Sequence, residues 1–184
     1  MISKKVILFV ASIYPSLAYS QPAKPGAEAV MECRQATKAQ PHVGVAYTGH
    51  VKNQDYDFSV RIPPGLTAWG GVARDAPFHG FTVFLGPTTR SCIVFEIHIR
   101  VDEEDAVLPA SGAARLQLGK AQGWQTTEQA MVHGVSMTSV KTTLAFSRPG
   151  GTVDGEILLI SPTSMLHETK GTYDGLLHSL SFGR

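Results

Sequence analysis

The segment Ser91–Val101 alternates between apolar and polar side chains, and this pattern constrains the fold more than any other feature of the chain. From residue 93 onward, every odd position is apolar: Ile93, Phe95, Ile97, Ile99 and Val101. Glu96, His98 and Arg100 occupy even positions. Because successive side chains of a strand point to opposite faces of a sheet, the pattern predicts a strand with one buried face and one partly solvated face.

Shorter segments of strand-like composition lie on both sides of this one. We predict further strands over residues 43–48, 56–62, 81–85, 126–131, 136–146 and 153–161. In the second of these, Tyr56, Phe58, Val60 and Ile62 alternate onto one face. The chain also has 18 glycines and 11 prolines, several in Pro-Gly or Gly-Gly pairs, which is typical of strands joined by turns.

Three segments have helical composition or spacing. We predict helices over residues 26–40, 110–121 and 168–180. The last of them places Tyr173, Leu176, Leu177 and Leu180 at helical spacing. Strands dominate the middle of the chain, so the predicted fold is α+β, a mainly antiparallel sheet flanked by helices in a single domain.

The first 20 residues have the form of an export signal. Lys4 and Lys5 precede an apolar segment over Val6–Tyr14, and Ala18-Tyr19-Ser20 has the small residues of a cleavage site. The apolar segment is too short to span a bilayer of roughly 30 Å. We therefore expect a signal peptide over 1–20, an N-terminal lead with a short helix over 21–42, and a single α+β domain over 43–184. The expected location is the periplasm or the outside of the cell, without a membrane anchor.

The chain contains two cysteines, Cys33 and Cys92. An oxidising compartment favours pairing them in a disulfide, with free or catalytic thiols as the alternative. On the chain-entropy model, closing a loop of about 60 residues stabilises the fold by roughly 4 kcal/mol. The bridge is therefore expected to join the N-terminal lead to the predicted strand over 91–101.

The charge balance argues against one class of function. The sequence has 16 Lys and Arg against 15 Asp and Glu, and two of the lysines lie in the predicted signal peptide. The mature chain is therefore close to neutral. Proteins that bind nucleic acid by neutralising phosphates carry a clear basic excess, so we predict no nucleic-acid partner.

Three short motifs resemble those of PsbP/Mog1-like exported domains. They are the opening Tyr56-Asp-Phe58-Ser-Val60-Arg-Ile62-Pro63, the late strand Ile157-Leu-Leu-Ile160, and the terminal helix running from Tyr173 to Phe182. The resemblance covers residues 43–182 in order. It implies an antiparallel sheet sandwiched by helices, and a domain that acts as an accessory or binding module rather than as an enzyme.

Two segments are candidates for contact with a partner. Residues 63–79 form a long irregular stretch that contains Trp69 and His79, and such loops are often functional. The alternative is a surface loop that packs Trp69 and Phe78 over the edge of the core. The run Asp102-Glu103-Glu104-Asp105 offers a local negative charge, with a solvated strand end as its alternative.

The seven histidines suggest a metal site, but none has the spacing of a known zinc motif. We therefore predict no metal and no cofactor. The rival hypothesis is a small exported hydrolase or metalloenzyme that uses His79, His98 or His133.

Together these observations favour an exported, non-catalytic binding or accessory protein with a protein partner. An immunity protein that neutralises a toxin in the periplasm is the specific version of this hypothesis. Its acidic run over 102–105 would occupy a basic active site of the toxin.

The disulfide makes a direct prediction. Peptide mapping of the exported protein without reductant is expected to recover Cys33 and Cys92 in one linked pair of peptides. Recovery of both cysteines as free thiols would contradict the prediction.

Overall fold

The computed structural model describes residues 33, 45–70, 80–86, 91–100, 112–149 and 151–183. The predicted signal peptide lies outside these ranges, and of the N-terminal lead only Cys33 lies within them, where it is helical. His79 and the acidic run 102–105 also lie outside the described residues. Within the described ranges, no helix is long and apolar enough to cross a membrane.

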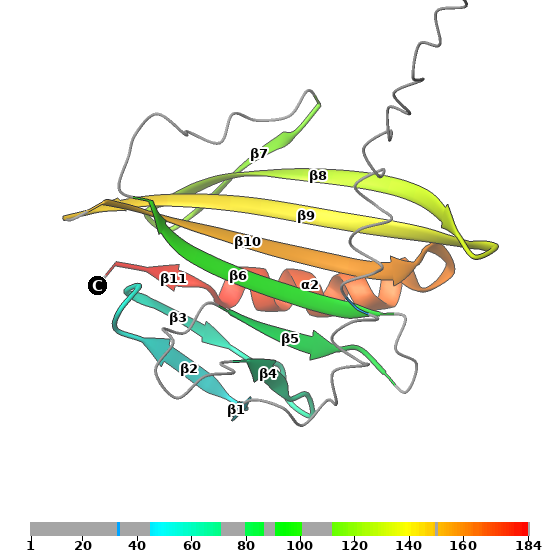
Figure 1. The fold of residues 1–184 in the computed structure, drawn as a ribbon, viewed down its shortest axis with the longest axis horizontal. Helices are drawn as coiled ribbons and strands as arrows, with labels where there is room; N and C mark the ends of the chain where they lie inside the picture. Colours follow the sequence, from blue (N-terminus) through cyan, green and yellow to red (C-terminus); the bar gives the residue numbers. More distant parts are fainter. Residues whose placement is uncertain are drawn as a thin grey trace, which may run out of the picture.

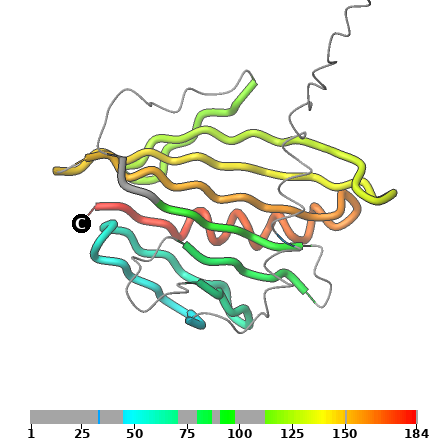
Figure 2. The backbone as a smooth tube through the Cα atoms, in the orientation of Figure 1, coloured from blue at the N-terminus to red at the C-terminus, as the bar shows by residue number. Residues whose placement is uncertain are grey.

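An antiparallel sheet of eight strands forms the centre of the structure (Figure 1). Its strand order is β1-β4-β5-β6-β10-β9-β8-β7. In that order the strands are β1 (Val45–Tyr47), β4 (Ala68–Gly70), β5 (Gly80–Phe84), β6 (Cys92–Arg100), β10 (Gly151–Pro162), β9 (Val135–Arg148), β8 (Ala121–Val132) and β7 (Ala114–Leu118). The long strands β8, β9 and β10 run side by side along the sheet, so they provide its most extended surface (Figure 2).

A second layer covers one face of this sheet. It consists of a small antiparallel sheet in the order β11-β3-β2, and of helix α2 (Leu166–Ser179), which follows the short 3₁₀ helix η2 (Thr163–Met165). The small sheet contains β2 (His50–Asn53), β3 (Phe58–Arg61) and β11 (Ser181–Phe182). Figure 1 shows α2 behind β6 and β10. The helix therefore covers one face of the large sheet and leaves the opposite face uncovered.

The main core lies between these two layers. Ile93, Phe95 and Ile97 of β6 are fully buried, as the alternation in the sequence predicts. The ring of Phe95 packs edge-on against that of Phe58 in the small sheet, with centroids 5.3 Å apart. It also packs against Phe81 of β5 at 5.1 Å. The contact with Phe58 joins the two sheets, and Phe146 of β9 makes a second such contact with Phe182 of β11, with centroids 5.5 Å apart.

Tyr173 fastens α2 to the large sheet. Its side chain is fully buried, and its hydroxyl lies 2.6 Å from Thr142 Oγ1 and 3.2 Å from the carbonyl oxygen of Ile157. Burial raises the pKa of Tyr173 above its ordinary value, because the phenolate would lose its hydration there. The hydroxyl therefore remains a hydrogen-bond donor to the sheet.

The opposite face of the large sheet carries a smaller apolar cluster around the predicted disulfide. Cys33 and Cys92 are bonded, with their Cα atoms 6.2 Å apart, which confirms the pairing. The two cysteines pack with Met137, Leu158 and Ile160. The disulfide thus ties the helical residue Cys33 to the face that α2 does not cover.

The structure confirms the α+β class and all of the predicted strands, together with the C-terminal helix. Two predictions were wrong. Residues 68–70 were assigned to a loop, but they form β4, which pairs with β1 on one side and β5 on the other. The helix predicted over 110–121 is absent from the described part of that segment, where β7, a turn and the start of β8 stand instead.

The second error has a clear physical cause. Alanine, leucine and glutamine favour a helix by intrinsic propensity, but propensity is weak beside tertiary packing. Gly119, which has a φ of 58°, is the first residue of a two-residue turn. The residues on either side of this turn, Leu118 and Ala121, pair with each other. Two-residue hairpin turns commonly need glycine at this first position. Pairing of β7 with β8 therefore outweighs the helical preference.

A pair of glycine substitutions tests the strand packing. A Cβ on Gly123 of β8 would collide with the carbonyl oxygen of Thr143 and approach Leu144 Cδ2 to 2.7 Å. We expect Gly123→Ala to lower the free energy of unfolding by about 1–3 kcal/mol. Gly171→Ala in α2, where nothing lies within 4 Å of the new Cβ, is expected to raise it by up to about 1 kcal/mol. Urea unfolding of both variants measures this, and equal effects would contradict it.

Candidate functional site

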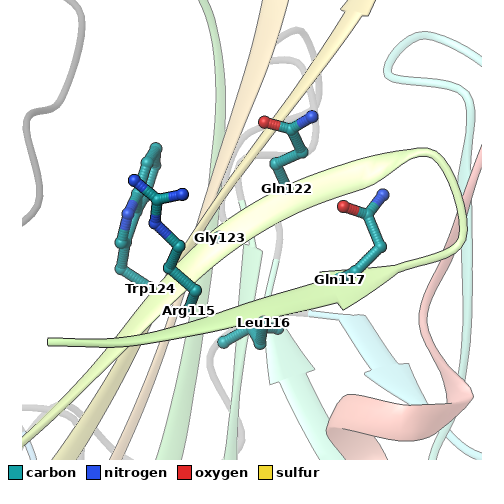
Figure 3. Close-up of a pocket in the computed structure, with 6 residues that line it drawn as sticks. All are labelled: Arg115, Leu116, Gln117, Gln122, Gly123 and Trp124. Atoms are coloured by element: carbon teal, nitrogen blue, oxygen red, sulfur yellow. The ribbon is translucent and has the colours of Figure 1, made fainter.

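Four side chains of the β7–β8 hairpin project from one side of it (Figure 3). Arg115 of β7 pairs with Trp124 of β8, and Gln117 pairs with Gln122. Leu116 and Gly123 form the pair between these two, and the six residues line a hollow of about 450 Å³. We call this site the hairpin hollow.

The local sequence explains the geometry of the hollow. Alternation in β7 sends Arg115 and Gln117 to one face, while Leu116 points away from them and packs against the main core (Figure 3). Gly123 stands opposite Leu116 and has no side chain, so β8 can approach β9 closely. The hollow therefore lies on the face of the large sheet that α2 leaves uncovered.

The hollow is rich in hydrogen-bond donors. Arg115 is exposed, and within the described ranges it has neither a hydrogen-bond nor an ion-pair partner. The indole Nε1 of Trp124 is buried and also lacks a partner among the described residues. Gln117 Nε2 already donates to the carbonyl oxygen of Gly119 at 2.7 Å. A group that brings acceptor oxygens, above all a carboxylate, is the natural complement of Arg115.

An ion pair lies on the same face of the sheet as Arg115. The row that contains Arg115 and Trp124 continues through Thr143 of β9 to Glu156 of β10. Glu156 forms an ion pair with Lys141, and both side chains are partly exposed. Exposed pairs contribute at most about 1 kcal/mol. The pair nevertheless neutralises Glu156 locally, and among the described residues Arg115 has no carboxylate partner.

Trp69, one of the predicted partner contacts, lies elsewhere on the sheet. It is half-buried in β4, where it pairs with Thr82 of β5. Five strand spacings separate β4 from β8, which at about 4.8 Å each is roughly 24 Å. Trp69 and Trp124 therefore do not form one site. The other predicted contacts, His79, Asp102, Glu103, Glu104 and Asp105, lie outside the described residues.

The structure does not bring His98 and His133 together. His98 is in register with Asp154 and, across β10, with Ala145 of β9. His133 stands at the β8–β9 turn with a φ of 47°, beside Gly134. Eleven residues of β9 separate Ala145 from that turn, which at about 3.3 Å per residue is roughly 36 Å. Among the described residues, no group of three or more His, Cys, Asp or Glu side chains is placed to hold a metal ion.

A second hollow, of about 230 Å³, lies beside the small sheet. Three of its polar side chains are engaged in the fold: the hydroxyls of Ser59 and Ser181 lie 2.9 Å apart, and Asn53 Oδ1 accepts a hydrogen bond from the backbone of Tyr56. These groups hold β2, β3 and β11 in place. The hairpin hollow is therefore the better candidate for binding.

Sequence reasoning missed all four polar residues of the hairpin hollow. The predicted helix over 110–121 scattered Arg115 and Gln117 around a helical surface and left Trp124 without a context. The signal that would have found them is the alternation Arg115-Leu-Gln-Leu118 followed by Gly119, which is a strand running into a tight turn.

The fold has counterparts among solved structures, whereas no family model and no curated protein matches the sequence. LpqN of Mycobacterium tuberculosis, described as involved in cell envelope biogenesis, is 12% identical with a TM-score of 0.57. The match covers 76% of this chain and 92% of LpqN. A protein of Bacteroides thetaiotaomicron is 11% identical with a TM-score of 0.50, over 74% of this chain and 49% of that one.

A cyanobacterial PsbP from Synechocystis sp. PCC 6803 is also similar. It is 10% identical with a TM-score of 0.40, over 77% of this chain and 96% of PsbP. At the level of the fold, the match to LpqN supports the resemblance that the sequence suggested. At identities this low, the likeness is one of fold.

The free energies of unfolding of two variants test whether Arg115 of the hairpin hollow contributes to the stability of the fold. We expect Arg115→Glu to change the free energy of unfolding by less than about 0.5 kcal/mol, because Arg115 is exposed and has no partner in the described part of the chain. Tyr173→Phe, which removes the buried hydroxyl, is expected to cost about 1 kcal/mol or more. Urea unfolding measures both. A loss above about 1.5 kcal/mol in Arg115→Glu would assign Arg115 to the fold instead.

Proposed function

We propose that this protein is an exported, non-catalytic binding protein that acts as an accessory module, and that it binds a protein partner at the hairpin hollow. The observation that supports this most is the pairing of Trp124 with Arg115 at the hairpin hollow, where Arg115 has no partner among the residues that the structure describes. Tryptophan and arginine are the residues most enriched where protein interfaces concentrate their binding energy. A partner carboxylate would gain a charge-assisted hydrogen bond from Arg115.

Two observations support the compartment. The disulfide between Cys33 and Cys92 is of the kind that persists in oxidising compartments such as the periplasm. LpqN, which shares the fold, is described as a protein of cell envelope biogenesis. Together with the predicted signal peptide over 1–20, they favour a protein that works in the envelope or outside the cell.

Within this function, the specific version is an immunity protein that neutralises a toxin in the periplasm. Such a protein needs a rigid scaffold and a contact surface rather than catalytic groups. The acidic run 102–105, with Trp69 and His79, would form a second contact region on this proposal. The hairpin hollow and the acidic run carry opposite charges, so they would recognise different parts of a partner.

Affinity capture tests the proposal. The mature protein, residues 21–184, is used as bait for envelope and secreted fractions, and captured proteins are identified by mass spectrometry. We expect a stoichiometric protein partner whose recovery falls about tenfold or more with Arg115→Glu, since a charge-assisted contact is worth about 1.5–3 kcal/mol. A bait with residues 102–105 reversed to lysine tests the acidic run separately.

The matched control is Arg61→Glu, which makes the same charge change on an exposed residue of β3 in the small sheet. Capture with this variant is expected to equal that of the wild type. Absence of a partner with the wild-type bait, or equal recovery with Arg115→Glu, would contradict the proposal. For the immunity version, the captured protein must be toxic in the periplasm and lose its toxicity when the wild-type protein is present.

A further inference from the structure

Strand β7 ends the large sheet, and in the part of the chain that the structure describes it has β8 as its single neighbour. A strand in this position presents a row of backbone donors and acceptors that a further strand can use. Extended segments of partner proteins are often recognised in this way, with main-chain hydrogen bonds for affinity and alternate side chains for specificity.

The turn determines which backbone groups of β7 face outward. Across a two-residue turn, the flanking residues Leu118 and Ala121 form a hydrogen-bonded pair. Because hydrogen-bonded and non-hydrogen-bonded pairs alternate along antiparallel strands, Leu116 also bonds to β8. The N–H and C=O groups of Arg115 and Gln117 therefore point away from β8. These four groups form the docking edge.

The two faces of β7 differ in chemistry. On the face of the hollow, Arg115 and Gln117 are exposed, and Arg115 has no partner in the described ranges. On the other face, Leu116 and Leu118 are half-buried against the core. A strand laid along β7 would place alternate side chains beside these two faces. The complementary segment therefore alternates between acidic and apolar residues.

We infer that β7 receives an extended segment of the protein partner as an added strand, with its acidic side chains beside Arg115 and its apolar side chains beside Leu116 and Leu118. This inference rests on the proposed function and specifies how the partner is recognised. The hairpin hollow accommodates the side chains that project next to Arg115, in the direction of Trp124 (Figure 3).

A second copy of the chain complements this edge poorly. The strand reads Ala114-Arg-Leu-Gln-Leu118 and contains no acidic residue. Two copies paired edge to edge through β7 would leave both Arg115 side chains without a carboxylate from the facing strand. The charge pattern therefore favours a different protein.

Synthetic peptides test the inference on the mature protein. The probe is a labelled eight-residue peptide of alternating Glu and Val, measured by fluorescence polarisation at low salt. One control peptide has alternating Lys and Val, and another contains the Glu and Val residues in two separate blocks. We expect binding of the alternating acidic peptide alone. For Arg115→Glu, the preference is expected to reverse toward the lysine peptide.

The backbone contribution is tested by Gln117→Pro, with Gln117→Ala as its baseline. Both remove the side chain, but only proline removes the outward N–H, and its ring is tolerated on an edge strand. Gln117→Pro is expected to bind the acidic peptide about tenfold more weakly than Gln117→Ala, because one hydrogen bond is lost at a cost of about 1.4 kcal/mol. Equal affinity of the two variants would overturn strand addition.

Further measurements keep the inference falsifiable. Gln117→Pro is unsuitable if it unfolds at a lower urea concentration than Gln117→Ala. In that case the wild-type protein is tested with an acidic peptide N-methylated on alternate residues, and this peptide is expected not to bind. Binding of the block peptide as well as the alternating one would overturn the inference, as would a dimer in light scattering that Gln117→Pro abolishes. Loss of the captured partner with Arg115→Glu but full retention with Gln117→Pro would leave the proposed function standing and refute strand addition.

Discussion

The packing of α2 and the small sheet against one face of the large sheet determines which face of that sheet remains available for binding. Phe95 stands at the centre of that contact, with Phe58 on one side and Phe81 on the other. The hydroxyl of Tyr173 then fixes the helix to β9 and β10. With the core enclosed by apolar burial on this face, the opposite face carries Arg115, Trp124 and the ion pair of Lys141 with Glu156.

The opposite face is itself divided along its length. Near Cys92 it is apolar, and the disulfide to Cys33 keeps a residue of the N-terminal lead over Leu158 and Ile160. Toward β7 and β8 it is polar, with the ion pair of Lys141 and Glu156 between the two regions. The disulfide thus does more than constrain the unfolded chain. It also places Cys33 over the apolar part of this face, in contact with the cluster of Met137, Leu158 and Ile160.

Much of the fold was predictable from local patterns, because those patterns reflect which face is buried. The alternation in β6 and the helical spacing of Tyr173, Leu176 and Leu177 correspond directly to the main core. Strand β4 was not predictable in the same way, since its three residues carry no period of their own and are held by β1 and β5. For β7 the local composition predicted a helix. The segment forms a strand instead, because it pairs with β8 across the turn at Gly119.

The same reasoning explains why the candidate site escaped sequence analysis. Arg115 and Trp124 are nine positions apart, and nothing in their types or spacing indicates a shared function. They become neighbours because the chain turns at Gly119 and β7 pairs with β8. The recognisable feature of the hollow is therefore a pairing register rather than a motif. Residues whose role arises from register can be found in a sequence only when the turn that sets the register is identified first.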